Sequence, residues 1–211
     1  MQSVQGEFPV SDRIVLFDLG NVVVDWQPVR LYRKFFGTEE DAQRFVDQVC
    51  TLAWHVEHDK GVPMAENAAA LKALYPQFSP EIDAWRTRWF EMFDGYVGGT
   101  DALIERLHAA GHPLYGLSNM PAEVWPETIE RFPAIKRLRD VVVSGEEGVV
   151  KPDPAIYEIA LARMGQPDPA RVFFTDDSLR NVRAAAELGF DAHHFQGADD
   201  LEHALVSRGL L

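Results

Sequence analysis

Residues 17–26, FDLGNVVVDW, join one apolar run to another through an acid and a glycine. The first run, residues 14–17, stops at Asp18, and Gly20 and Asn21 precede the second. A short apolar run bounded by turn residues is typical of a buried strand. Ligands of open α/β sheets bind beyond the carboxyl ends of the strands, which is where Asp18 falls. One acid at such a position also fits a turn or helix cap, so its meaning depends on the other strands.

The pattern predicts four further strands after the one at residues 13–18. They span residues 113–118, 140–143, 171–176 and 191–195. From residue 100 onward the intervals have helical spacing and stop at glycine, as in DPAIYEIALARMG. Strands that alternate with helices imply right-handed crossovers and a mostly parallel sheet, so we expect an α/β fold.

The interval after the first strand is different. Between residue 25 and about residue 98 the sequence offers helical stretches and no strand candidate, whereas a crossover needs only about a dozen residues. We therefore expect an all-helical insert at residues 26–97, above the end of the first strand, and a core domain at residues 1–25 and 98–211. Four aromatic residues at helical spacing are predicted to form the core of the insert: Trp85, Trp89, Phe90 and Phe93.

Composition narrows the classes of partner and compartment. The 211 residues carry 33 acids and 20 bases, a formal charge of −13 that disfavours nucleic acid and anionic membrane as partners. No apolar run approaches the roughly 20 residues of a membrane span. The start, MQSVQGEFPVSD, lacks the features of a secretory signal, and a single cysteine, Cys50, allows no internal disulfide. We expect a cytoplasmic protein, either monomer or homodimer.

Polar side chains lie at the ends of three of the predicted strands, and a lysine lies just before a predicted helix. The set comprises Asp18, Ser118, Asn119, Asp176, Asp177 and Lys151. Carboxylates of this kind hold Mg²⁺ together with water and a substrate phosphate. The serine and asparagine could donate hydrogen bonds to phosphate oxygens, and the lysine could neutralise their charge. A carboxylate can also attack phosphorus and form an aspartyl-phosphate, which divides one difficult hydrolysis into two easier steps.

In this order the motifs resemble those of the haloacid dehalogenase (HAD) superfamily, and the resemblance covers essentially the whole chain. It implies a Rossmann-like core with an inserted C1-type helical cap, in which the second and fourth strands flank the first. Asp18 matches the nucleophile, which also binds metal, and Ser118 matches the hydroxyl residue of the second motif. Lys151 matches the third motif. Asp176 and Asp177 match the acidic pair of the fourth, with Asp177 the principal metal ligand.

Gly20 departs from the pattern of the Mg²⁺-dependent phosphatases of this family, which usually carry a second aspartate there. The Gly20 carbonyl can still bind the metal, but general acid–base help, typically worth about 10²–10⁴ in rate, cannot come from this position. The spacing in DLGNVVVD is similar to a branch that includes bacterial sugar-1-phosphate phosphatases. We therefore expect Mg²⁺-dependent hydrolysis of a small phosphorylated metabolite, such as a sugar phosphate.

Two alternatives stay open. A 2-haloacid dehalogenase needs no leaving-group proton, but such enzymes work without metal and have neutral residues at the fourth motif, where two acids repel each other here. A catalytically idle phosphometabolite-binding protein would have no need of Asp18.

Outside the four motifs, Trp54 and His55 of the insert are predicted to face substrate. The surrounding AWHVEHDKG matches no zinc signature. Asp25, where the chain leaves for the insert, is predicted to have a hinge or capping role. His193 and His194 are predicted to be structural, on an edge strand far from Asp18.

Overall fold

The structure is a computed structural model that describes residues 13–211. Its main sheet has five parallel strands in the order β5-β4-β1-β6-β7. They are β1 (Ile14–Phe17), β4 (Leu114–Ser118), β5 (Asp140–Val143), β6 (Val172–Asp176) and β7 (Asp191–His194). The five predicted strands, the α/β class and the central place of the first strand are confirmed. Residues 1–12, where no secretory signal is expected, lie outside the described residues.

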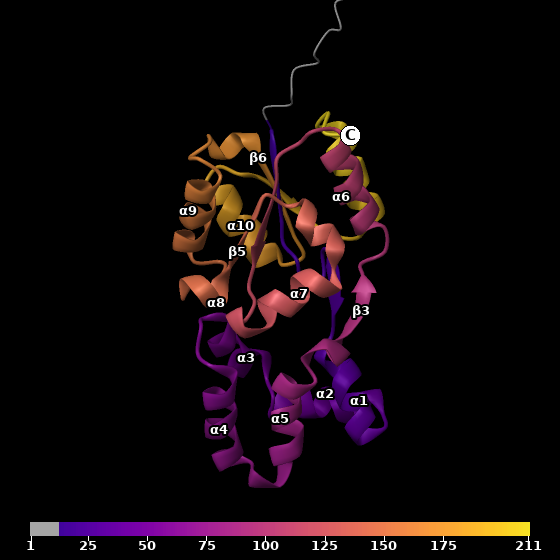
Figure 1. Cartoon of the computed structure of the whole chain (residues 1–211), viewed down its shortest axis with the longest axis vertical. Coiled ribbons are helices and arrows are strands. Elements are labelled where there is room, and N and C mark those ends of the chain that lie inside the picture. The colour runs from indigo at the N-terminus through magenta and orange to yellow at the C-terminus, as the bar shows by residue number, and fades with distance from the viewer. Residues whose placement is uncertain (1–12) are drawn as a thin grey trace, which may run out of the picture.

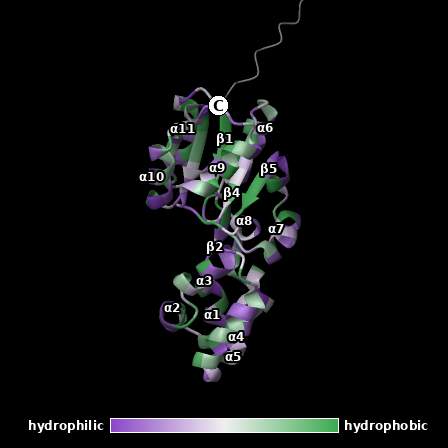
Figure 2. Cartoon of the chain, turned by 90° about the vertical axis from the view of Figure 1, so that its left-hand side faces the viewer, coloured by the Kyte–Doolittle hydropathy of each residue, from purple (hydrophilic) through white to green (hydrophobic). Residues whose placement is uncertain are grey.

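Alternate residues of β1 belong to two separate hydrophobic cores, one on each face of the sheet. Val15 and Phe17 pack on one face with α6 (Thr100–Ala109) and α11 (Ala198–Ser207), whereas Leu16 packs on the other face with α9 (Pro154–Arg163) and α10 (Leu179–Glu187). Side chains of a strand alternate between faces, and both faces are covered, so this strand is a continuous apolar run. Figure 1 shows α6 and α9 on opposite sides of the sheet, and Figure 2 shows apolar strands among helices with polar outer surfaces.

Five helices lie beyond the carboxyl end of β1, below the sheet in Figure 1. They are α1 (Pro28–Phe36), α2 (Glu39–Gln48), α3 (Leu52–Asp59), α4 (Met64–Leu74) and α5 (Ser79–Thr87). We call this group the cap; domain boundaries at residues 25 and 98 stay a prediction. The shorter helices α7 (Trp125–Arg131) and α8 (Ser144–Glu147) flank β5. Within residues 13–211 no helix is both long and apolar enough to cross a bilayer.

The expectation of an interval without strands is wrong. Strands β2 (Val24–Trp26) and β3 (Phe93–Tyr96) pair antiparallel where the chain leaves for the cap and returns from it. Both are too short for a period-two pattern to stand out in the sequence. Asp25 in β2 pairs with Arg30, which also donates to the Met92 carbonyl at 3.1 Å, in line with the predicted hinge role.

Candidate active site

Strand register brings the acids together. Phe17 lies opposite Thr175 in the β1–β6 pair, and the amide of Asp18 donates to the Thr175 carbonyl at 2.9 Å. Asp18 and Asp176 therefore follow at the same edge of the sheet. On the other side of β1, strand β4 ends at Ser118, so the site forms at the carboxyl ends of three adjacent strands.

A tight turn sets the orientation of Asp18. The Leu19 amide donates to Asp18 Oδ1 at 2.6 Å, and the Leu19 carbonyl accepts from the Val24 amide at 2.9 Å. Asn21 closes the turn with a φ of 56°, and its Oδ1 accepts from the Trp26 amide at 3.1 Å. Asparagine tolerates this left-handed conformation better than most residues, which explains its place in the sequence GNV.

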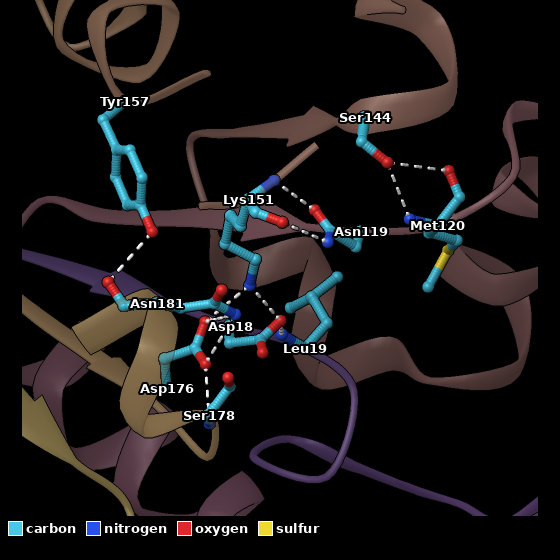
Figure 3. A network of polar contacts seen from close by, with 10 residues as sticks. All are labelled: Asp18, Leu19, Asn119, Met120, Ser144, Lys151, Tyr157, Asp176, Ser178 and Asn181. Carbon is cyan, nitrogen blue, oxygen red and sulfur yellow. Dashed lines mark hydrogen bonds and ion pairs between the residues drawn. The ribbon is translucent and has the colours of Figure 1, made fainter. Parts of the chain in front are cut away.

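Lys151 lies between two carboxylates (Figure 3). Its Nζ is 2.8 Å from Asp18 Oδ1 and 2.7 Å from Asp176 Oδ2, and its side chain is only 1% exposed. Burial alone would lower the pKa of Lys151, but Asp176 and Asp18 raise it, so the side chain is an ammonium ion. Burial and the charge of Asp176 raise the pKa of Asp18, and Lys151 opposes that shift.

The two acids of the fourth motif have different surroundings. Asp176 accepts from the Ser178 amide at 2.8 Å and from Asn181 Nδ2 at 3.0 and 3.1 Å, whereas Asp177 is exposed. Sequence reasoning missed Asn181. Its position one helical turn after the acidic pair could have indicated that it contacts Asp176. The last strand, β7, is at the edge of the sheet as expected and is separated from β1 by β6, but His194 Nε2 is 3.0 Å from the Asp177 carbonyl.

The acids fit a divalent cation. Asp18, Asp176 and Asp177 each offer an oxygen, and these atoms lie within 4.8 Å of one another. Burial and Asp176 also raise the pKa of Asp177, against the lowering effect of Lys151. If all three acids are ionised, the single ammonium of Lys151 cannot balance their charge. Oxygen ligands of this kind are those that Mg²⁺ prefers.

Ser118 and Asn119 differ in whether their side chains have hydrogen-bonding groups available to a ligand. Ser118 Oγ is buried in the site and has no hydrogen-bond partner within residues 13–211, so it is available to a ligand oxygen. The Asn119 carboxamide is already engaged, since its Oδ1 accepts from the Lys151 amide at 2.8 Å and its Nδ2 donates to the Lys151 carbonyl at 3.1 Å. Its side chain thus positions Lys151, a role that differs from the predicted phosphate donor.

A cavity of about 240 Å³ connects these groups to the cap. Its cap and hinge wall is mostly apolar: Trp26, Leu52, His55, Val56, Trp89 and Phe93. His55 faces the cavity as predicted. Trp54 does not line it but packs edge-on against Trp85, with ring centroids 5.3 Å apart. Trp54 therefore lies outside the cavity wall, whereas Trp89 and Phe93, which pack in the core as predicted, also line the cavity.

Two buried titratable groups complete the cap wall. Burial and His58 lower the pKa of His55 to about 3, and burial raises the pKa of Asp59 to about 8. His55 Nε2 lies 3.4 Å from Asp59 Oδ1. At pH 7 the imidazole is neutral and the carboxyl is mostly protonated, so this is a contact between uncharged groups and no ion pair. Sequence reasoning missed Asp59.

The family model for haloacid dehalogenase-like hydrolases matches residues 13–189. The chain belongs to this family. The HAD-like hydrolase is 25% identical over 208 residues to a sesquiterpene phosphatase of Aspergillus oryzae, which covers 94% of this chain and 96% of that protein. It is 24% identical over 180 residues to a phosphorylated carbohydrates phosphatase of Thermotoga maritima, with 84% and 82% covered.

Two further matches concern a shorter region and the fold. Flavin mononucleotide hydrolase 1 of Arabidopsis thaliana is 29% identical over 116 residues, which are 54% of the HAD-like hydrolase but only 46% of that protein. A HAD family enzyme of Bacteroides thetaiotaomicron, solved with magnesium and inorganic phosphate, has a TM-score of 0.69 at 23% identity, over 91% of this chain and 98% of that one. The predicted family and the hydrolase class are confirmed.

Proposed function

We propose that this hydrolase cleaves a small phosphomonoester with Mg²⁺ bound, through an aspartyl-phosphate on Asp18. The observation that carries the proposal is a cluster of three acids, two of which contact one buried lysine. Such a site attracts a divalent cation, and cation and lysine together would balance the charge of a phosphoryl group. The names of two relatives as phosphatases, and the magnesium and phosphate bound by the Bacteroides enzyme, support the same reading.

One carboxylate oxygen of Asp18 has hydrogen-bond partners, and the other is available to react. Oδ1 accepts from the Leu19 amide and Lys151, whereas Oδ2 has no hydrogen bond to any residue of 13–211. Oδ2 would attack phosphorus while the bond from phosphorus to the leaving oxygen breaks. Water then hydrolyses the aspartyl-phosphate and restores the carboxylate. Each step has a lower barrier than direct attack by water.

The neighbouring groups would stabilise the phosphoryl oxygens. Mg²⁺ would be held by Asp18, Asp177, Asp176 and the Gly20 carbonyl, and when bound it supplies positive charge to the transferring group. Ser118 Oγ, which is buried without a partner among the described residues, would donate to a phosphoryl oxygen. Lys151 would neutralise charge and keep Asp18 oriented.

The cavity wall favours an uncharged, apolar leaving group. Trp26, Leu52, Val56, Trp89 and Phe93 line it, and the one Lys or Arg side chain among the described lining residues is Lys151. A second phosphate or a carboxylate would find no cation, and a sugar would leave hydroxyls against apolar side chains. Aromatic or alkyl phosphomonoesters therefore fit better than the sugar phosphates that the first motif indicates. At about 240 Å³ the cavity suits a small ligand.

The two alternatives have less support. A dehalogenase would have no use for two acids at the end of β6, where Asp176 and Asp177 stand. An idle binding protein would have no use for a nucleophile that a buried lysine holds in place.

The test is an assay of phosphate release from aryl, prenyl and sugar 1-phosphates, each with Mg²⁺ and with EDTA, beside an assay of halide release from 2-chloropropionate. We expect turnover that requires Mg²⁺, with kcat/KM for the aryl and prenyl phosphates about tenfold or more above the sugar phosphates. Full turnover in EDTA would contradict the proposal. Halide release would favour the dehalogenase, and phosphate binding without turnover the idle protein.

A further inference from the structure

We propose that Asp59, at the end of cap helix α3, is the general acid and base of this hydrolase, in place of the side chain that Gly20 lacks. The inference rests on the proposed function, because it concerns the same aspartyl-phosphate chemistry. Asp59 and Asp18 line one cavity, the first from the cap and the second from the core. A proton donor on the cap wall would share this cavity with the leaving oxygen.

The space beside Gly20 is open. A Cβ at this position would meet no heavy atom within 4 Å, so no other side chain has moved into contact there. Gly20 also has no positive φ, and its backbone therefore does not require glycine. A proton donor must come from elsewhere on the cavity wall. Apart from the acids and lysine already assigned, the titratable residues of this wall within residues 13–211 are His55 and Asp59.

His55 is not suited to give a proton. Its Nδ1 lies 3.3 Å from His58 Nδ1 and its Nε2 lies 3.4 Å from Asp59 Oδ1, so both ring nitrogens already face neighbours. Burial lowers the pKa of His55 to about 3, which keeps the ring neutral at pH 7.

Asp59 has a proton and a free oxygen. Oδ1 is covered beside His55 and makes no hydrogen bond within the described chain, which leaves Oδ2 as the oxygen that can reach the cavity. Burial raises the pKa of Asp59 to about 8, although the charge of Lys151 lowers it. A buried carboxyl kept neutral near pH 7 is the state that a general acid requires.

The charges around Asp59 are consistent with this state. Its own helix carries His55, whose Nε2 is 3.4 Å from Asp59 Oδ1, and His58, and the same cavity is lined by Lys151, Asp18 and Asp177. On α8, which packs against α3, Glu146 is exposed and Glu147 pairs with Arg163. On α4, Glu66 is exposed and Lys72 pairs with Asp83. Among these residues no cation is in direct contact with Asp59.

The two steps balance in atoms and charge. As Asp18 Oδ2 bonds to phosphorus, the bond from phosphorus to the leaving oxygen breaks, and the proton of Asp59 passes to that oxygen. The products are an alcohol, the aspartyl-phosphate and an Asp59 carboxylate. In the second step the Asp59 carboxylate takes a proton from water as the water oxygen bonds to phosphorus. Phosphate leaves, Asp18 is again a carboxylate and Asp59 is again protonated.

The experiment compares the wild type, Asp59→Asn and the control Glu57→Gln over aryl and alkyl phosphates with leaving groups of graded pKa. Glu57 is on the same helix and pairs with Lys60 on the surface. We expect Asp59→Asn to lower kcat/KM about 10²–10³-fold for alkyl phosphates and less than about tenfold for dinitrophenyl phosphate. The basic limb of the wild-type pH profile, near pH 8, should disappear. Glu57→Gln should match the wild type throughout.

A second variant separates a catalytic role from a structural one. In the double variant Gly20→Asp with Asp59→Asn, the new acid enters the open space, and activity on alkyl phosphates should partly return. Asp59→Glu keeps an acid at this position and replaces Asp59→Asn as the test if that variant fails to fold. The basic limb of the pH profile should persist in Asp59→Glu. Equal losses for all leaving groups, or an unchanged basic limb in Asp59→Asn, would overturn the inference and leave the proposed function intact. Absence of Mg²⁺-dependent release from dinitrophenyl phosphate by the wild type would instead defeat the proposed function.

Discussion

Asn119 holds both polar groups of the Lys151 main chain, with its Oδ1 2.8 Å from the amide and its Nδ2 3.1 Å from the carbonyl. The contact connects the end of β4 to a loop 32 residues later in the chain. Lys151 in turn bridges Asp18 and Asp176 (Figure 3), so one carboxamide aligns the ends of three strands. Asn119 therefore acts on the site through the lysine.

Replacing Asn119 with alanine should misplace the lysine. We expect Asn119→Ala to lower kcat about 10–100-fold with little change in KM, because small errors of position are costly in catalysis. The matched control is Asn67→Ala, which removes a similar carboxamide contact to the Trp54 carbonyl at 3.0 Å inside the cap. Steady-state kinetics at saturating Mg²⁺ measure both. Equal effects of the two variants would count against the positioning role.

Replacing the nucleophile should stop the reaction. Asp18→Asn keeps the size of the side chain, so we expect an intact fold, no phosphorylated protein and a loss of kcat on the order of 10³-fold or more. Asp94→Asn, at an exposed acid of β3, is the control. The measurements are phosphate release and intact mass after rapid quenching. Wild-type activity in Asp18→Asn would show that the covalent route is wrong.

Adding an acid at Gly20 should change the dependence on leaving group. In the wild-type background, Gly20→Asp has open space for its Cβ and no strained φ to adopt. If the new carboxyl reaches the leaving oxygen, the slope of log kcat/KM against leaving-group pKa should flatten. Gly20→Asn is the control, since it adds similar volume without the acid. The same slope for both variants would mean that the added acid does not protonate the leaving group.

The apolar mouth of the cavity should select substrates. Leu52 lines the cavity yet is 54% exposed, and Leu74 is 74% exposed on α4 away from it. Leu52→Ser should raise KM for aryl and prenyl phosphates several-fold, since it removes apolar contact worth about 1–2 kcal/mol. KM for sugar phosphates should change little. Leu74→Ser should leave every KM unchanged, and a rise in that variant would locate the effect outside the cavity.

Asp59 should make stability depend on pH. In the unfolded chain its pKa is about 4, and in the folded chain burial raises that pKa to about 8. Between these values the folded state binds more protons, so the free energy of unfolding falls as pH rises, by up to about 1.4 kcal/mol per pH unit. Asp59→Asn removes this dependence.

The difference in Tm between Asp59→Asn and the wild type should therefore grow from pH 5 to pH 8.5, by about 2–4 °C per kcal/mol. Glu57→Gln should differ from the wild type by a constant amount. Thermal melts of all three proteins across that range provide the measurement. A pH-independent difference for Asp59→Asn would show that Asp59 ionises normally in the folded state.

The sequence alone was enough for the sheet and for the residues at its edge. Buried parallel strands are continuous apolar runs, and chain polarity brings their carboxyl ends to one side, so Asp18, Ser118 and Asp176 could be predicted to meet. The place of Lys151 in the site was predicted from its match to the third motif of the HAD superfamily. The short strands β2 and β3 gave no periodic signal, because three or four residues are too few to define one.

The cap side of the site depended on tertiary packing. Trp85 and Trp89 occur at helical spacing, which predicts packing in the cap but not that Trp89 also lines the cavity while Trp54 of α3 packs against Trp85 outside the cavity wall. Asp59 appeared in the sequence as one acid of a polar segment. Its role depends on burial, which removes water from a carboxyl and keeps it protonated. Such burial comes from residues distant in the chain, so sequence spacing alone does not reveal it.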